Sequence, residues 1–439
     1  MVLDPSLVEA ALFSIAVLLS VAASRHIALA AALMLSFLPV ARTEVPLFGA
    51  AIGLRPEDVM IGILALRAVF TRLLGNSSRR QNPFLASYAG LVAVCALSFL
   101  WVAAAWASGA SQGAPPTLYF AQKMIGASVM LWVVWDTCRT WDALKWSVGA
   151  VIVGGLIMFG LVFFTAEGQQ TSAPESADYY SEMYQAKFHN VGRLTQWNPN
   201  VVGMSFGMLL IVTAGVLALR PPAKYRVLLS AAGVMFAYGL SRSYTRTAMF
   251  AAAASAAYVF FRLAYLGYAR RGVLTVLLLG ICVGGTVLYT VDTNALHFDL
   301  GQNLNTGSRL AVWSIGLDLL LTHPAGLGIG RAEQVAADTM LFDSAHNDWL
   351  DYGLEIGVCG SLYALWTFWR LYGQCRAATR VPGAMIPCIL AEALMVFFFV
   401  ASLALQVFTF QKQVFVGIAI LACFVQLASE MPSRRLRPR

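Results

Sequence analysis

The chain has 439 residues, of which 59% are apolar and only 12% are charged, and its formal net charge at pH 7 is +8. This composition excludes a water-soluble globular domain, because too few polar side chains are present to cover the surface of the core. It predicts a polytopic membrane protein.

Apolar runs follow one another along the chain, most of them close to the roughly 20 residues that a helix needs to cross a bilayer. They lie at residues 7–23, 26–41, 56–75, 84–106, 118–135, 145–165, 198–219, 225–240, 246–266, 273–291, 348–371, 383–405 and 413–429. The first two runs are short, so a shallow hairpin and one broken element are both open there. We therefore predict an all-α fold of roughly 12 or 13 transmembrane helices, forming one integral membrane domain over residues 1–439.

Lysine and arginine in short loops set the orientation, because such loops stay on the cytoplasmic face. Basic residues cluster in alternate connections and in the tail 430–439, which predicts a cytoplasmic C-terminus. The segments 42–58, 107–117, 167–197, 241–246, 292–347 and 406–412 are then expected on the outer side. The net charge is mostly this topological signal, with attraction for anionic lipid, and does not indicate nucleic-acid binding.

Common signatures of metal and nucleotide chemistry are absent from the sequence. It contains no CxxC pair, HExxH, Walker-type loop or GxGxxG. We therefore predict neither a cofactor nor a metal site.

The 167–197 loop, predicted to lie on the outer side, leads through Asn198-Pro-Asn200 into the next apolar run. Asn198 ahead of Pro199 is typical of a helix N-cap. Arg193 close to Trp197 has a functional alternative, since arginine donates hydrogen bonds in a fork and indole stacks on sugar rings.

A second outer site is Ser241-Arg-Ser-Tyr-Thr-Arg246, a tight turn between two apolar runs. Arginine at the outer membrane boundary runs against the positive-inside trend. Arg242 and Arg246 either contact lipid phosphate or hold a phosphate group of a lipid-linked substrate.

The segment 292–347 is the longest polar stretch and the expected catalytic segment. Within it, residues 307–322 predict an amphipathic surface helix that carries Arg309 and Trp313 and stops at His323-Pro324. Gly326-Leu-Gly-Ile-Gly330 follows as a turn that allows close backbone approach. Arg309 either pairs with Asp299 or Asp318, or serves a function.

His346 closes this segment, where the chain re-enters the bilayer ahead of Asn347, Asp348 and Asp351. Imidazole titrates near neutral pH and can accept a proton from a sugar hydroxyl, and a neighbouring carboxylate could orient the ring. A capping or structural role is the alternative.

Four motifs in order make a specific pattern: Thr245-Arg-Thr-Ala248, Gly307-Ser-Arg309 with Trp313, Pro324 with Gly326-Leu-Gly-Ile-Gly330, and His346-Asn-Asp-Trp-Leu350 with later glycines. Over residues 190–372 the chain resembles the O-antigen ligase and polymerase superfamily of bacterial envelope glycosyltransferases. The resemblance implies a GT-C-like membrane transferase of the bacterial inner membrane. Such enzymes move a glycan from undecaprenyl diphosphate to an acceptor hydroxyl on the periplasmic face, with inversion and without a metal; for the ligases, the acceptor is lipid A–core.

Carried over by position, the resemblance assigns catalytic roles to Arg246, Arg309 and His346. The arginines would hold the diphosphate, and the histidine would activate or orient the acceptor. The expected substrate-binding set is Arg55, Lys123, Arg193, Arg242, Trp313, Arg331 and Asn347.

Ligase is favoured over polymerase, because the basic residues of the 167–197 loop are only Lys187 and Arg193, whereas polymerases often carry arginine-rich outer loops. A protein O-oligosaccharyltransferase of the same superfamily stays open. From a different class, a transporter or flippase of a lipid-linked solute would suit many spans with an intramembrane charge such as Glu392, although the sequence shows no convincing internal repeat.

Overall fold

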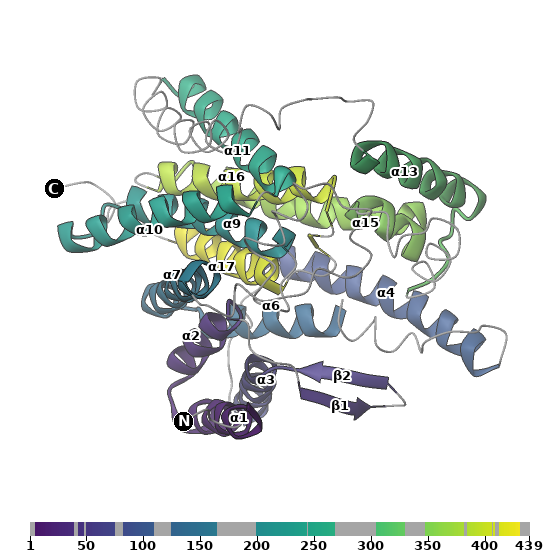
Figure 1. Cartoon of the computed structure of the whole chain (residues 1–439), viewed down its shortest axis with the longest axis horizontal. Coiled ribbons are helices and arrows are strands. Elements are labelled where there is room, and N and C mark those ends of the chain that lie inside the picture. Colours follow the sequence, from purple (N-terminus) through teal and green to yellow (C-terminus); the bar gives the residue numbers. More distant parts are fainter. Residues whose placement is uncertain are drawn as a thin grey trace.

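The computed structural model describes residues 5–38, 43–47, 50–74, 82–108, 124–164, 199–243, 245–267, 304–329, 347–381, 384–405, 407–408 and 412–430. Within these ranges the chain forms α-helices and one β-hairpin (Figure 1). The helices are α1 (Pro5–Ala22), α2 (Arg25–Leu35), α3 (Pro56–Leu74), α4 (Pro83–Ala107), α6 (Gly126–Thr137), α7 (Trp141–Phe164), α9 (Pro199–Ala218), α10 (Ala223–Arg242), α11 (Arg246–Tyr265), α13 (Leu304–Thr322), α15 (Asp348–Ala378), α16 (Met385–Ser402) and α17 (Lys412–Ser429).

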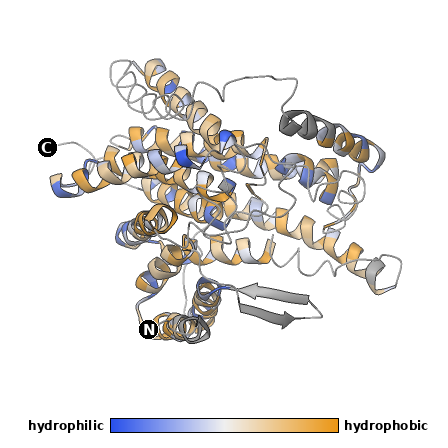
Figure 2. Ribbon diagram, viewed as in Figure 1, coloured by the Kyte–Doolittle hydropathy of each residue, from blue (hydrophilic) through white to orange (hydrophobic). Residues whose placement is uncertain are grey.

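A helix occupies every predicted apolar run except 273–291, which lies outside the described residues. The first two runs are two separate helices, α1 and α2. Six helices in the described part of the chain are long and apolar enough to cross a membrane, namely those that include Pro83–Ala104, Trp141–Phe164, Asn200–Ala218, Arg246–Tyr265, Met385–Ser402 and Lys412–Ser429. The polytopic membrane class is thus supported, and the count of 12 or 13 spans stays a prediction. Figure 2 shows apolar residues along most of the helical surfaces.

The hairpin was not predicted from the sequence. Strands β1 (Thr43–Leu47) and β2 (Ala50–Leu54) pair antiparallel, with Thr43 opposite Leu54. The hairpin falls inside the segment 42–58, which the sequence analysis places on the outer side. Two short strands can satisfy each other's backbone groups where the chain leaves the helical bundle.

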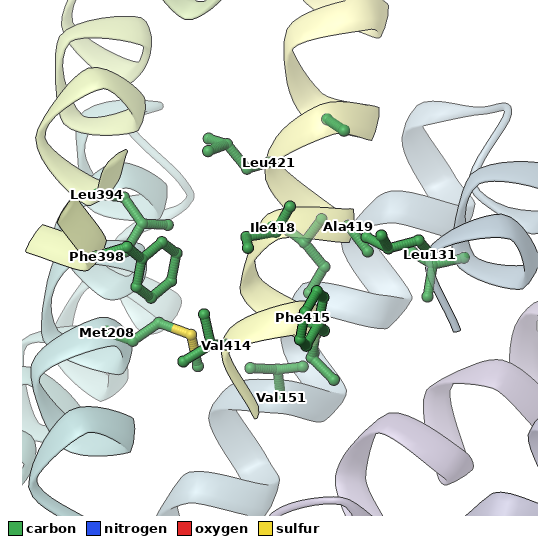
Figure 3. Packing of buried hydrophobic residues seen from close by; sticks show 14 of the residues in the cluster. Leu131, Val151, Met208, Leu394, Phe398, Val414, Phe415, Ile418, Ala419 and Leu421 are labelled. Carbon is green, nitrogen blue, oxygen red and sulfur yellow. The ribbon is translucent and has the colours of Figure 1, made fainter. Parts of the chain in front are cut away.

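The centre of the bundle is α17, which packs against α6, α7, α9, α15 and α16. Figure 3 shows Phe415 and Ile418 of α17 among side chains from neighbouring helices, including Leu131, Val151, Met208 and Phe398. By contrast, α4 exposes Leu97, Leu100 and Trp101. Since lipid is as apolar as these side chains, close packing rather than water exclusion holds membrane helices together. The interior position of α17 therefore reflects shape complementarity.

Contacts between helix ends show which of them lie at the same end of the bundle. Asp348, at the start of α15, accepts hydrogen bonds from the backbone N–H groups of Val407 (2.7 Å) and Phe408 (2.9 Å), between α16 and α17. Lys412, at the start of α17, pairs with Glu57 at the start of α3 (3.1 Å). The starts of α3, α15 and α17 and the end of α16 therefore share one end, here called the α15 end.

The α10–α11 turn lies at the α15 end as well, because α11 runs antiparallel to α16. Ser255 of α11 donates to the Ala393 carbonyl of α16 (3.0 Å), and Arg262, later in α11, pairs with the earlier Glu392 (3.2 Å). The start of α11 thus lies beside the end of α16.

Candidate functional site

The turn at 241–246 joins two helices, as the sequence predicts: Arg242 is the last residue of α10 and Arg246 the first of α11. Ser243 stabilises it, since its hydroxyl donates to the Leu240 carbonyl (2.7 Å) and accepts from the Thr245 N–H (3.3 Å). The arginines at the ends of this turn are therefore held at a defined place in the bundle.

Helix α9 supports the same turn at a glycine. A Cβ on Gly203 would lie 2.6 Å from the Ser243 hydroxyl and 2.6 Å from the Thr245 Cβ, so only glycine lets α9 approach this closely. Ser243 and Thr245 are buried, Arg242 is half-buried and Arg246 is exposed. The packing thus buries the small residues of the turn and leaves Arg246 at the surface.

The start of α15 is anchored by two consecutive side chains. Asn347 is the N-cap: its Oδ1 accepts from the N–H groups of Trp349 (3.0 Å) and Leu350 (3.2 Å), and its Nδ2 donates to the Leu403 carbonyl (3.1 Å). Asp348 is buried and holds the α16–α17 connection. Asn347 therefore caps α15, and its predicted part in substrate binding stays a prediction.

His346 lies outside the described residues, but the structure bears on its expected partner. A carboxylate next in sequence was considered as the group that orients the imidazole. The Asp348 carboxylate accepts hydrogen bonds from two backbone N–H groups beyond α16. These bonds fix the start of α15, which directly follows His346-Asn347 in the sequence, and the predicted carboxylate partner of His346 stays a prediction.

Helix α13 confirms the helix predicted at 307–322 and ends at Thr322, directly before His323-Pro324. A Cβ on Gly316 would meet the Leu350 side chain at 2.8 Å, and one on Gly353 would meet Leu320 at 3.0 Å. Later residues of α13 thus face later residues of α15, so the two helices run in the same direction. Figure 1 shows them side by side.

The parallel arrangement places the N-terminal part of α13, and with it the backbone of Arg309, toward the end at which α15 begins. The Arg309 side chain is outside the description. Trp313 is partly buried against a small cluster formed by Val312, Leu350 and Leu354. Trp313 therefore has a structural contact. Its role in substrate binding stays a prediction.

The glycine-rich segment after α13 docks on a break in α15. Gly357 has φ 79° and ψ 172°, which interrupts the helix. The freed Leu354 and Glu355 carbonyls accept from the N–H groups of Leu327 (2.6 Å) and Gly328 (3.1 Å), and the Val358 N–H donates to the Pro324 carbonyl (3.0 Å). Backbone groups released by the break are thus satisfied by residues 324–328.

Glycine is required on both sides of this contact. A Cβ on Gly326 would lie 2.5 Å from the Gly357 nitrogen, and one on Gly357 would lie 2.7 Å from the Ala325 carbonyl carbon. Ser98 of α4 completes the junction by donating to the Glu355 carbonyl (3.0 Å) and accepting from the Ile329 N–H (3.1 Å). Sequence reasoning missed Ser98, because nothing local marks a serine in an apolar helix as a partner for a distant backbone.

Arg55 lies at the α15 end but is not an isolated cation. It is buried and sits 3.9 Å from Glu57, in a group that also contains Asp58 and Lys412. The acidic members of this group were missed by the sequence analysis, which considered only cations at the outer face. Local carboxylates offset the charge of Arg55, so its predicted contact with substrate rests on position alone.

The remaining predicted residues, Lys123, Arg193 and Arg331, lie outside the described residues. Among the residues that the structure does describe, no group of three or more His, Cys, Asp or Glu side chains could hold a metal ion. Glu392, the intramembrane charge that suited a transporter, accepts a hydrogen bond from Tyr258 and pairs with Arg262. Its charge is compensated by α11.

Comparison with known families identifies the central part of the chain. Residues 231–365 match a family model described as O-antigen ligase. This segment is an O-antigen ligase family domain. The resemblance to that superfamily is thus confirmed, and it implies a glycosyltransferase-type enzyme of the ligase and polymerase group in a bacterial membrane. No curated protein matches the chain.

The O-antigen ligase domain extends from within α10 to within α15. It contains Arg242, Arg246, Arg309 and His346, and it contains the break at Gly357 with the segment that docks there. The α10–α11 turn and the start of α15, far apart in sequence, both lie at the α15 end.

Proposed function

We propose that the protein is an O-antigen ligase. It transfers a glycan from undecaprenyl diphosphate to a sugar hydroxyl of lipid A–core, at the periplasmic face of the bacterial inner membrane. The α15 end is the periplasmic end in this proposal, which leaves the C-terminus in the cytoplasm, as the distribution of basic residues predicts.

The observation that carries the proposal is the convergence of sequence-distant parts of one family domain. Arg242 and Arg246 flank a turn at the α15 end, and α13, with Arg309 in its first half, runs parallel to α15, so its start points toward the same end. Arginine pairs with phosphate through two parallel hydrogen bonds, so guanidinium groups at one membrane surface suit a diphosphate.

The reaction follows from these roles. The acceptor hydroxyl attacks the anomeric carbon of the donor sugar from the face opposite the diphosphate, and the bond from that carbon to the diphosphate oxygen breaks. His346 takes the hydroxyl proton, and undecaprenyl diphosphate leaves as an anion. Arg246 and Arg309 stabilise the negative charge that grows on the leaving oxygen, which is where preorganised donors contribute most to the rate. The bond to diphosphate in the donor supplies the driving force.

The test is a reaction of purified protein with undecaprenyl-diphosphate glycan and lipid A–core, without ATP or an ion gradient. A ligase makes glycan-capped lipid A–core. A polymerase instead lengthens the glycan when the donor is the only substrate, and a transporter forms no new glycosidic bond. Restoration of a lipopolysaccharide ladder in a strain that lacks its own ligase is the matching test in cells.

A further inference from the structure

The opposite end of the bundle carries a second group of arginines, far from the α10–α11 turn. Arg25 of α2, Arg72 of α3 and Arg139, which follows α6, all contact the Asp136 carboxylate. The distances are 3.3 Å from Arg25 and 2.7 Å from Arg72. Three guanidinium groups against one carboxylate leave two excess positive charges.

These side chains line a cavity of about 270 Å³ between α2, α3, α6 and α7. Its polar wall also includes His26 and the hydroxyl-bearing Thr71 and Thr140. The Asp136 side chain is buried, whereas those of Arg25, Arg72 and Arg139 are 28%, 40% and 38% exposed. The carboxylate therefore lies on the buried side of the arginines, while their exposed parts line the cavity.

Two of the helices that line this cavity, α3 and α7, also carry exposed apolar side chains. Phe70 and Leu73 of α3 are 60% and 76% exposed, and Trp146 of α7 is 58% exposed. Exposed apolar side chains on a membrane helix face acyl chains, and tryptophan is enriched where acyl chains meet head groups. A positively charged cavity beside apolar, exposed side chains complements a phospholipid, which has an anionic head group and apolar acyl chains.

We propose that this cavity binds the phosphodiester head group of an anionic phospholipid, with phosphatidylglycerol as the probe. The phosphate contacts Arg25, Arg72 and Arg139 on the side away from Asp136, and the acyl chains lie along the apolar surface of α3 and α7. Positive-inside topology places this lipid in the cytoplasmic leaflet, where basic segments attract anionic lipid. The site is separate from the proposed transfer reaction at the α15 end.

The alternative is an ion-pair network that only holds α2, α3 and α6 together. The two roles differ in the effect of Asp136→Asn. Removal of the carboxylate takes away the anion that competes with phosphate, so a lipid site binds phosphatidylglycerol about threefold to tenfold more tightly. A purely structural network loses stability and gains no lipid affinity.

The experiment is a titration of the full-length protein in detergent with phosphatidylglycerol or phosphatidylcholine, followed by native mass spectrometry. We expect wild-type protein to retain phosphatidylglycerol in preference to phosphatidylcholine. Arg139→Gln should weaken the retention of phosphatidylglycerol about tenfold, because one charge-assisted hydrogen bond to the phosphate is lost. Arg25→Gln is the second variant if Arg139→Gln does not elute as a single folded species.

Lys145→Gln is the matched control. Lys145 is on α7 at the same end of the bundle, pairs with Asp142 at 3.0 Å and is 72% exposed, but it does not line the cavity. Equal retention of phosphatidylglycerol by wild type, Arg139→Gln and Arg25→Gln would overturn the proposal. Equal competition by soluble glycerol 3-phosphate would also overturn it, because a free phosphate compound would then satisfy the site without acyl chains.

Discussion

Arg246 and Arg262 lie on the same helix in different surroundings. Arg262 is mostly buried and pairs with Glu392 of α16, which ties the two helices together. Arg246 is exposed at the first position of α11, where backbone N–H groups at a helix start also favour an anion. Arg262 thus has a structural role inside the bundle, whereas the position of Arg246 suits contact with a substrate.

Arg246→Ala should lower transfer activity about 100-fold or more, by analogy with the loss of one donor to a developing anion. The protein should remain inserted, because the side chain is exposed. Activity is measured as glycan-capped lipid A–core formed per enzyme. Arg226→Ala is the control, since Arg226 is exposed near the start of α10, at the opposite end. Full activity in Arg246→Ala would remove this residue from the mechanism.

Arg309 and His346 allow a finer test by residue type. Arg309→Lys should impair transfer almost as strongly as Arg309→Ala, because an ammonium group cannot reproduce the paired hydrogen bonds of guanidinium to phosphate. His346→Ala should abolish the lipopolysaccharide ladder in cells while membrane insertion is kept. A wild-type ladder from either alanine variant would refute the role proposed for that residue.

At the scale of elements, the junction of the glycine-rich segment with α15 holds the middle of the O-antigen ligase domain together. Pro324, Leu327 and Gly328 bond to the broken helix, and Ser98 of α4 bonds to Glu355 and Ile329 at the same place. A short segment between α13 and α15 thus fixes how the two helices sit relative to each other. The position of Arg309 in the first half of α13 and that of the start of α15 both depend on it.

Gly357→Ala should destabilise the protein by about 2–4 kcal/mol, because alanine disfavours positive φ and its methyl group would overlap the Ala325 carbonyl. The measurement is the midpoint of thermal unfolding in detergent, together with transfer activity. Gly373→Ala is the matched control in the same helix, since a Cβ there has nothing within 4 Å. Helix propensity predicts unchanged or slightly higher stability for the control. Equal stability of the two variants would contradict the close backbone contact.

At the scale of the whole molecule, the two ends of the bundle differ in the chemistry they carry. The α15 end has the α10–α11 turn, the start of α15 and the Glu57–Lys412 pair, and the opposite end has the arginines around Asp136. Each end is assembled from helices far apart in sequence. The assignment of these ends to the two sides of the membrane can be tested directly.

Two single-cysteine variants, Leu403→Cys and Lys224→Cys, show on which side of the membrane each end of the bundle lies. They are made in a protein in which all seven native cysteines are replaced by alanine. Leu403 is 41% exposed at the end of α16, and Lys224 is exposed at the start of α10. A membrane-impermeant maleimide should label Leu403→Cys in cells whose outer membrane alone is permeabilised, and Lys224→Cys only after the inner membrane is opened. The reverse pattern would invert the topology and place the α15 end in the cytoplasm.

The sequence alone determined the membrane class, nearly all of the helix positions and the family of residues 231–365, because apolar run length and ordered motifs are local properties of the chain. It also identified Arg246 at the start of a helix and the helix that carries Arg309.

Only the tertiary structure decided that Asn347 and Asp348 anchor the start of α15, that the glycine segment fills a break at Gly357, and that Arg55 is balanced by Glu57. Each of these depends on backbone or charged groups brought together from distant parts of the chain. A buried polar group must find a partner, and which partner it finds depends on helix packing, which no local pattern of residues records.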